Sequence, residues 1–120
     1  MNYFKKRIDA FGFAFSGLFA AIKTEAHLKI HFVATTVVIA AGLYFKINKV
    51  DWLAIIICCG AVITAELFNS AIEKLCDVVS PQVNPKIKII KDISAAAVLV
   101  LSITSVVVAL LVFFNYLAPQ

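Results

Sequence analysis

The sequence predicts an all-α membrane protein with three transmembrane helices and a further helix at its N-terminal end. Of the 120 residues, 62% are apolar and 15% are charged, which is far from the balance of a soluble domain of this size. The apolar residues gather in three stretches, at 28–46, 50–76 and 93–117. Each stretch is long enough to cross about 30 Å of hydrocarbon at a rise of about 1.5 Å per residue. Without repeats or low-complexity segments, residues 1–120 are predicted to form one membrane domain.

The N-terminal segment, residues 1–26, is predicted to be a surface helix ahead of the first span. Large apolar residues recur in it at spacings of three and four, with most charged residues off the stripe that they form: Phe4, Ile8, Phe11, Phe15, Leu18 and Ile22. This pattern is typical of an amphipathic helix in the membrane interface. A helix packed on the bundle has the same pattern, so both interpretations stay open. Polar residues interrupt any signal-like apolar stretch, so we expect the segment to remain on the mature protein.

Two polar segments connect the spans, KINKVD at 46–51 and DVVSPQVNPKIKIIKD at 77–92. The prolines and Asn84 of the longer segment predict a break in helical structure. Five basic residues lie before or at the start of the first span and three lie in 77–92, against two in 46–51 and none after the last span. Basic loops are retained on the cytoplasmic side, so we expect the N-terminus and the 77–92 loop there. These loops also explain the net charge of +4, so nucleic acid is not an expected partner.

Three carboxylates lie at the end of the second span, where the sequence reads VITAELFNSAIEKLCDV. At about 100° per residue, four polar residues share one face within about 60° of one another, namely Glu66, Ser70, Glu73 and Asp77. Like charges on one face need cations or protons, and Lys74 is turned about 100° from Glu73 around the helix. The face is therefore predicted to serve a metal ion, a cationic partner or a proton. A hydrogen-bonded contact between helices would explain only Ser70 and Asn69 at the edge of the face.

Polar residues outside this helix are expected at the same cytoplasmic level. Glu25 precedes the first span, and Lys91 and Asp92 precede the third. Taken singly, Glu25 fits an exposed helix residue, and the Lys-Asp pair fits a membrane anchor with a helix cap. Together they supply carboxylates for Mg²⁺ and a cation for phosphate, as phosphoryl transfer requires. No GxxxxGK[ST] or GxGxxG motif is present, and spacing alone does not separate a kinase from a proton carrier.

The stretches AELFNSAIEKLCDVVSP (65–81) and KIIKDISAAAV (88–98) closely resemble the signature of the small prokaryotic diacylglycerol kinase family, which includes undecaprenol kinases. The resemblance extends upstream through the FxFSGLxxAxxxE portion that ends at Glu25. It implies transfer of the γ-phosphate of ATP, with Mg²⁺, to the hydroxyl of undecaprenol or diacylglycerol. It also implies a homotrimer with shared active sites in the bacterial cytoplasmic (inner) membrane, acting in phospholipid or carrier-lipid metabolism.

The resemblance further implies roles for single residues. Glu66 matches the general base that takes the proton of the lipid hydroxyl, and Asn69 matches a polar residue beside the reacting centre. Glu25 and Glu73 match the carboxylates that hold magnesium on ATP. The other positions expected at ATP are Lys6, Phe13, Asp77, Lys91 and Asp92. The positions expected at the lipid, besides Glu66, are Phe15 and Ser94.

Some residues depart from the family pattern. Lys6 stands where Arg is expected, and Phe13 stands where some members carry Tyr. Asn84 replaces a frequent loop His, and Ala96 replaces a frequent Gly. The changes at Phe13 and Asn84 affect how the adenine end would be held rather than the phosphoryl chemistry.

The lipid and the class of activity are less constrained by the sequence. The segments LKIHF, VDWLAI and AIEKLCDVVSP are more similar to the undecaprenol branch than to the diacylglycerol branch. A competing interpretation is a non-enzymatic multi-span protein in which Glu66 passes a proton or the polar face pairs helices. That interpretation leaves four residues unexplained: Glu25, Glu73, Lys91 and Asp92.

Overall fold

The computed structural model describes residues 2–118 and forms four helices from them, with no strand in this range. The helices are α1 (Tyr3–Thr24), α2 (Ala26–Phe45), α3 (Lys49–Val79) and α4 (Pro85–Leu117). Helices α2, α3 and α4 are each long and apolar enough to cross a membrane. The all-α class and the three spans predicted from the sequence are therefore confirmed.

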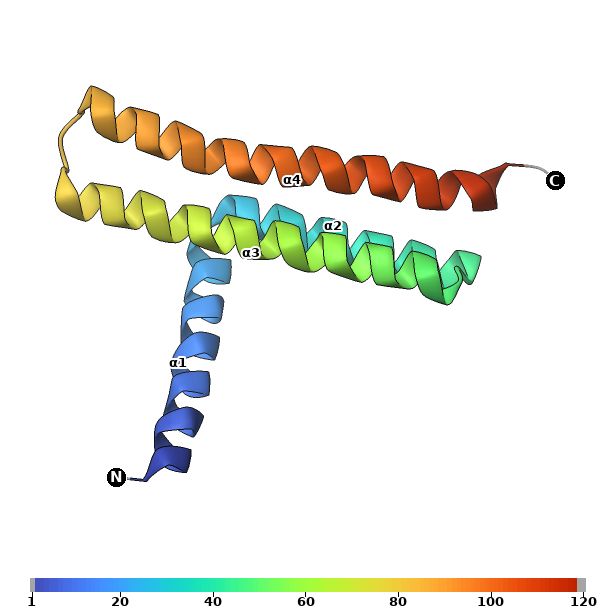
Figure 1. Ribbon diagram of the computed structural model, residues 1–120, viewed down its shortest axis with the longest axis horizontal. Coiled ribbons are helices and arrows are strands. Elements are labelled where there is room, and N and C mark those ends of the chain that lie inside the picture. Colours follow the sequence, from blue (N-terminus) through green and yellow to red (C-terminus); the bar gives the residue numbers. More distant parts are fainter. Residues whose placement is uncertain (1, 119–120) are drawn as a thin grey trace.

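The three long helices run side by side, and α3 packs against both α2 and α4 (Figure 1). Helix α1 leaves this bundle steeply at its junction with α2. The α3–α4 hairpin extends beyond that junction, toward the loop that connects the two helices (Figure 1). The charged ends of α3 and α4 thus lie on the same side of the bundle as the α1–α2 junction.

Asparagine side chains begin three of the four helices. The Oδ1 atoms of Asn2, Asn48 and Asn84 each accept a backbone N–H of the first turn at 2.9 Å. These bonds satisfy donors that a helix N-terminus otherwise leaves unpaired. Pro85 follows the last of these caps, in the first turn where its missing N–H costs no hydrogen bond.

The break in helical structure predicted from the prolines and Asn84 is confirmed, but it is shorter than the polar segment 77–92. Helix α3 continues to Val79 and α4 begins at Pro85, so only residues 80–84 lie between them. The cause is the position of Pro85, because a proline interrupts the interior of a helix but fits its first turn. As a result, Lys86, Lys88 and Lys91 belong to the helix that carries the third span.

The turn between α2 and α3 is fastened to the end of α4. The Tyr116 hydroxyl donates to Asp51 Oδ2 at 2.8 Å and accepts the Asn48 backbone N–H at 3.0 Å. Three buried apolar residues at this end form the core of the single chain, namely Ile47, Ile55 and Val112. The apolar core therefore lies toward the opposite end of α3 from Glu66, Glu73 and Asp77.

We predict that Gly42→Ala destabilises the fold. An added Cβ would lie 2.7 Å from the ring of Trp52, which packs against the core, so the indole would have to move. Overpacking of this kind costs about 1–3 kcal/mol, and thermal unfolding in detergent would show it as a lower Tm. Gly60→Ala is the matched control, because nothing lies within 4 Å of its added Cβ. Equal melting temperatures for the two variants would contradict the prediction.

Most apolar surface of the long helices faces outward, and α1 has no buried residue. Four residues of the stripe predicted on α1 are exposed as well, namely Phe4, Ile8, Phe11 and Phe15, whereas Leu18 and Ile22 are partly buried. Exposed apolar surface of this extent needs lipid or another protein to cover it.

Candidate active site

The buried face of α3 changes from apolar to polar along the helix. Ile55 and Val62 are buried on it, and Glu66, Asn69 and Ser70 continue the same face toward the charged end. The Glu66 residue is only 3% exposed. A carboxylate removed from water in this way is costly unless it is paired or serves a function.

Asn69 links this buried section to the next turn of α3. Its Nδ2 donates to Glu73 Oε1 at 3.2 Å, while its Oδ1 and the Ser70 Oγ are buried without a hydrogen-bond partner. Buried polar atoms usually have partners, so unpaired ones mark positions that a ligand or a further chain can satisfy. The polar face predicted on α3 therefore retains hydrogen-bonding capacity within one chain.

Glu25 lies in the bend between α1 and α2, not within a helix. Its backbone is extended (φ −104°, ψ 111°), and its Oε1 lies 2.5 Å from Lys74 Nζ. Lys74 is turned away from the carboxylate face of α3, yet its long side chain reaches this carboxylate of another segment. Glu25 is thereby held against the turn of α3 that carries Glu73.

Two more ion pairs lie where α3 ends and α4 begins. Lys91 Nζ is 2.7 Å from Asp77 Oδ1, and this pair joins the helices across the loop. Lys88 Nζ is 2.6 Å from Asp92 Oδ2, within α4. Lys91 and Asp92 therefore do not pair with each other, because Lys91 pairs with Asp77 and Asp92 pairs with Lys88. Asp92 is also not a helix cap, because α4 begins at Pro85.

The predicted site residues of α1 are not brought to this cluster within one chain. Lys6, Phe13 and Phe15 are exposed, and over residues 2–118 no side-chain hydrogen bond or ion pair connects them to α3 or α4. Ser94, by contrast, is buried on α4. The structure thus assembles the α3, α4 and Glu25 parts of the predicted site and leaves the α1 part separate.

Two residues near these carboxylates were not predicted from the sequence. His31 Nε2 on α2 lies 3.5 Å from Glu66 Oε2, and Lys74 pairs with Glu25. His31 had a signal, since an ionisable residue inside a predicted span is a candidate for function. For Lys74, the helical periodicity predicted a position off the carboxylate face. Its contact with Glu25 is visible only in the three-dimensional structure.

The oxygen atoms at this end suit magnesium bound to a nucleotide. Mg²⁺ is commonly held by one or two carboxylates together with phosphate oxygens, and Glu25 and Glu73 offer oxygens of this type. Among residues 2–118, no group of three His, Cys, Asp or Glu side chains forms a complete protein cage for a metal. The unpaired Asn69 Oδ1 next to Glu73 adds an oxygen that accepts donors or a cation.

Known proteins resemble this chain over most of its length. Residues 12–113 match the family described as prokaryotic diacylglycerol kinase. The chain belongs to this family. It is 29% identical over 112 residues to the undecaprenol kinase of Bacillus subtilis (strain 168), covering 93% of this chain and 91% of that relative. It is 30% identical over 93 residues to a diacylglycerol kinase of Pseudomonas aeruginosa, covering 78% of this chain and 76% of that relative.

The chain is accordingly a lipid kinase, as the sequence resemblance indicated. This finding sets aside the competing interpretation of a non-enzymatic multi-span protein. A lipid kinase acts on an apolar alcohol and a phosphate donor. Membership of this family is therefore compatible with a buried carboxylate on α3 close to charged helix ends.

Proposed function

We propose that this lipid kinase transfers the γ-phosphate of ATP to the hydroxyl of a membrane lipid, undecaprenol or diacylglycerol, with the help of Mg²⁺. The observation that carries the proposal is the position of Glu66, buried on α3 and followed within two turns by the charged cluster of Glu73, Glu25 and Lys74. A lipid hydroxyl can reach Glu66 from the membrane, and a nucleotide can reach the exposed end.

The spacing on α3 suits a transfer between these two regions. Glu66 and Glu73 are about 10 Å apart along the helix axis at a rise of about 1.5 Å per residue. Asn69 lies between them and donates to Glu73, so the transferred phosphoryl group would pass at its level. Glu66 accepts the hydroxyl proton as the lipid oxygen bonds to the γ-phosphorus. The bond from that phosphorus to the β–γ bridging oxygen breaks, and ADP leaves.

The nucleotide end would be held by carboxylates and cations of several segments. Glu25 and Glu73 would hold magnesium, which neutralises charge on the phosphate oxygens when bound. The other residues proposed at ATP are Lys6, Phe13, Asp77, Lys91 and Asp92. Lys91 would contact the phosphates, and Asp77 orients its ammonium group. Phe15 and Ser94 would contact the lipid together with Glu66.

We further propose that residues 1–120 form one domain that assembles as a homotrimer with shared active sites. The outward-facing apolar surface and the unpaired Asn69 and Ser70 atoms support additional contacts between chains. Shared sites would also bring Lys6 and Phe13 of α1 to a nucleotide that they do not reach within one chain.

The proposed location is the bacterial cytoplasmic (inner) membrane, with the N-terminus and the α3–α4 loop in the cytoplasm. The distribution of basic residues supports this orientation, and the exposed apolar stripe of α1 supports an amphipathic helix in the interface, where it would gate lipid entry. Between the two lipids we favour undecaprenol, because the undecaprenol kinase relative aligns over more of the chain.

Transfer of labelled γ-phosphate from MgATP in detergent micelles tests the proposal, with undecaprenol and diacylglycerol offered side by side. Label in one lipid and not the other would identify the substrate, and omission of magnesium should remove the signal. Absence of label in both lipids, together with no stabilisation of the protein by MgATP, would contradict the proposed function.

We predict that Lys74→Met increases the apparent affinity for magnesium. The ammonium group neutralises Glu25 in the absence of metal, so the metal must displace it. Exposed ion pairs are worth about 0.2–1 kcal/mol, which corresponds to an increase of up to about fivefold. The measurement is the magnesium concentration at half-maximal thermal stabilisation in the presence of a non-hydrolysable ATP analogue.

Lys86→Met is the matched control for this change, because it removes the same charge from the same end of the molecule. A magnesium requirement that rises in Lys74→Met, or that changes equally in both variants, would show that Lys74 does not compete with the metal for Glu25.

A further inference from the structure

The buried side chain of Glu66 has one ionisable partner in ion-pair range, and it comes from a different helix. His31 Nε2 on α2 lies 3.5 Å from Glu66 Oε2, and over residues 2–118 Glu66 forms no other ion pair. A carboxylate that is only 3% exposed depends on such a partner for its orientation and its charge. The contact with His31 therefore helps to set the orientation of the Glu66 carboxylate.

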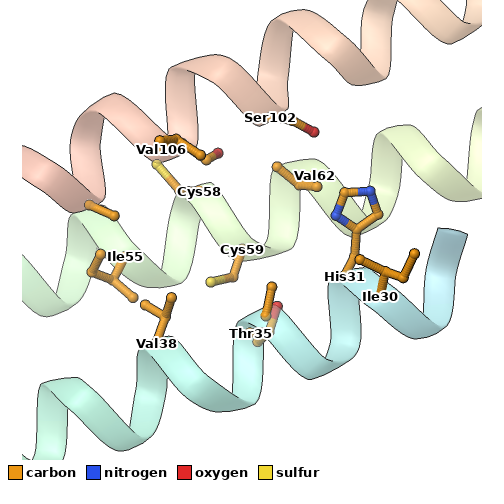
Figure 2. Close-up of a pocket in the computed structure, with 13 residues that line it drawn as sticks. Ile30, His31, Thr35, Val38, Ile55, Cys58, Cys59, Val62, Ser102 and Val106 are labelled. Carbon is orange, nitrogen blue, oxygen red and sulfur yellow. The ribbon is translucent and has the colours of Figure 1, made fainter.

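His31 also lines an apolar groove between the three long helices. The groove has a volume of about 300 Å³ and is lined mainly by small and apolar side chains, including Val38, Ile55 and Val62. Figure 2 shows the His31 ring extending from α2 at one end of the groove, on the side of Val62. One turn beyond Val62 on the same buried face of α3 is Glu66. The histidine thus lies between apolar space, suited to a lipid chain, and the buried carboxylate.

We propose that His31 is a positioning residue for Glu66. With Nε2 3.5 Å from Oε2, an Nε2–H directed at Oε2 would leave Oε1 free to accept the proton of the lipid hydroxyl. An imidazole donates from Nε2 both in its neutral Nε2–H tautomer and in its doubly protonated form. Catalytic bases are commonly oriented by such a third group, which contacts the base and not the reacting atoms. This inference rests on the proposed role of Glu66 as the base.

The groove explains why this contact should control turnover more than nucleotide binding. His31 is on α2 beside the apolar groove, whereas Asp77 and Lys91, two of the residues proposed at ATP, lie beyond Glu66 at the ends of α3 and α4. Loss of the imidazole would misorient the base without altering the carboxylates proposed to bind magnesium. The effect should therefore appear in kcat and leave the KM for MgATP unchanged.

A conservative and a disruptive variant separate positioning from packing. His31→Leu is expected to lower kcat by about 10- to 100-fold, the scale of a lost hydrogen bond to a charged group. His31→Gln retains an N–H donor of similar reach and should restore most of the activity. The control is His27→Leu, which removes the exposed histidine one turn earlier on α2 and should leave kcat unchanged. Equal losses in His31→Leu and His31→Gln, or no loss in either, would overturn the proposal.

A spectroscopic measurement tests the contact independently of activity. His27 and His31 are the only two histidines, so ¹⁵N-labelled histidine gives two sets of imidazole signals. Glu66→Gln should shift the His31 nitrogen resonances and leave those of His27 in place. Unshifted His31 signals would overturn the inference even if Glu66→Gln is inactive. Shifted signals in a Glu66→Gln variant that remains active would instead retain the contact and refute Glu66 as the base.

Discussion

Glu66→Gln is expected to lower kcat for phosphate transfer by at least about 100-fold, the scale that general-base catalysis contributes. Glutamine has nearly the same shape as glutamate, so the buried face of α3 should still pack, but its amide cannot take the hydroxyl proton. Glu66 is also separated from the charged helix ends proposed to bind the nucleotide. MgATP should therefore stabilise the variant as it stabilises the unchanged protein. Labelled phosphate transfer and thermal unfolding with MgATP measure the two effects.

The matched control for this variant is Glu73→Gln, the same chemical change two turns further along α3. Because Glu73 is proposed to hold magnesium, this control should raise the magnesium requirement and recover turnover at high magnesium. Near-normal kcat in Glu66→Gln would refute the assignment of the base. A loss of MgATP stabilisation in Glu66→Gln would show that Glu66 belongs to the nucleotide site instead.

The helices could be predicted from the sequence because each depends on local periodicity and length. The three apolar stretches are long enough to span a bilayer, and α1 (Tyr3–Thr24) lies within residues 1–26, where the apolar stripe predicted a helix. The start of α4 could not be predicted in the same way. The prolines and Asn84 correctly predicted a break between the helices, but they did not show that Pro85 lies in the first turn of α4 after the Asn84 cap.

The candidate site was predictable where its residues share one helix. The face of Glu66, Asn69 and Glu73 follows from the turn of α3 alone, and the structure pairs Asn69 with Glu73. Contacts between helices depend on how far each helix is displaced along its neighbour, which periodicity does not specify. This is why His31 and Lys74 were missed. The roles assigned to the site residues stay predictions.

Lys91 provides the second large expected effect, because it is the cation proposed to contact the phosphates. The ion pair with Asp77 holds its ammonium group at the junction of α3 and α4, with a separation of 2.7 Å. Both side chains are at least partly exposed, and exposed pairs contribute only about 0–1 kcal/mol to stability. A large loss of activity on removal of Lys91 would therefore reflect lost charge stabilisation during transfer rather than unfolding.

Lys91→Met is expected to lower kcat/KM for MgATP by about 100- to 1000-fold, the range for removal of one group that stabilises developing charge. Asp77→Asn should cause a smaller loss, because it retains the ammonium group and removes only the carboxylate charge that orients it. Lys86→Met is the control, since it removes a lysine of the same helix for which no phosphate contact is proposed. Steady-state kinetics with varied MgATP would measure all three variants. If Lys91→Met lowers kcat/KM no more than Lys86→Met does, Lys91 has no specific phosphate contact. The lysines of this end would then attract the nucleotide through their combined positive charge.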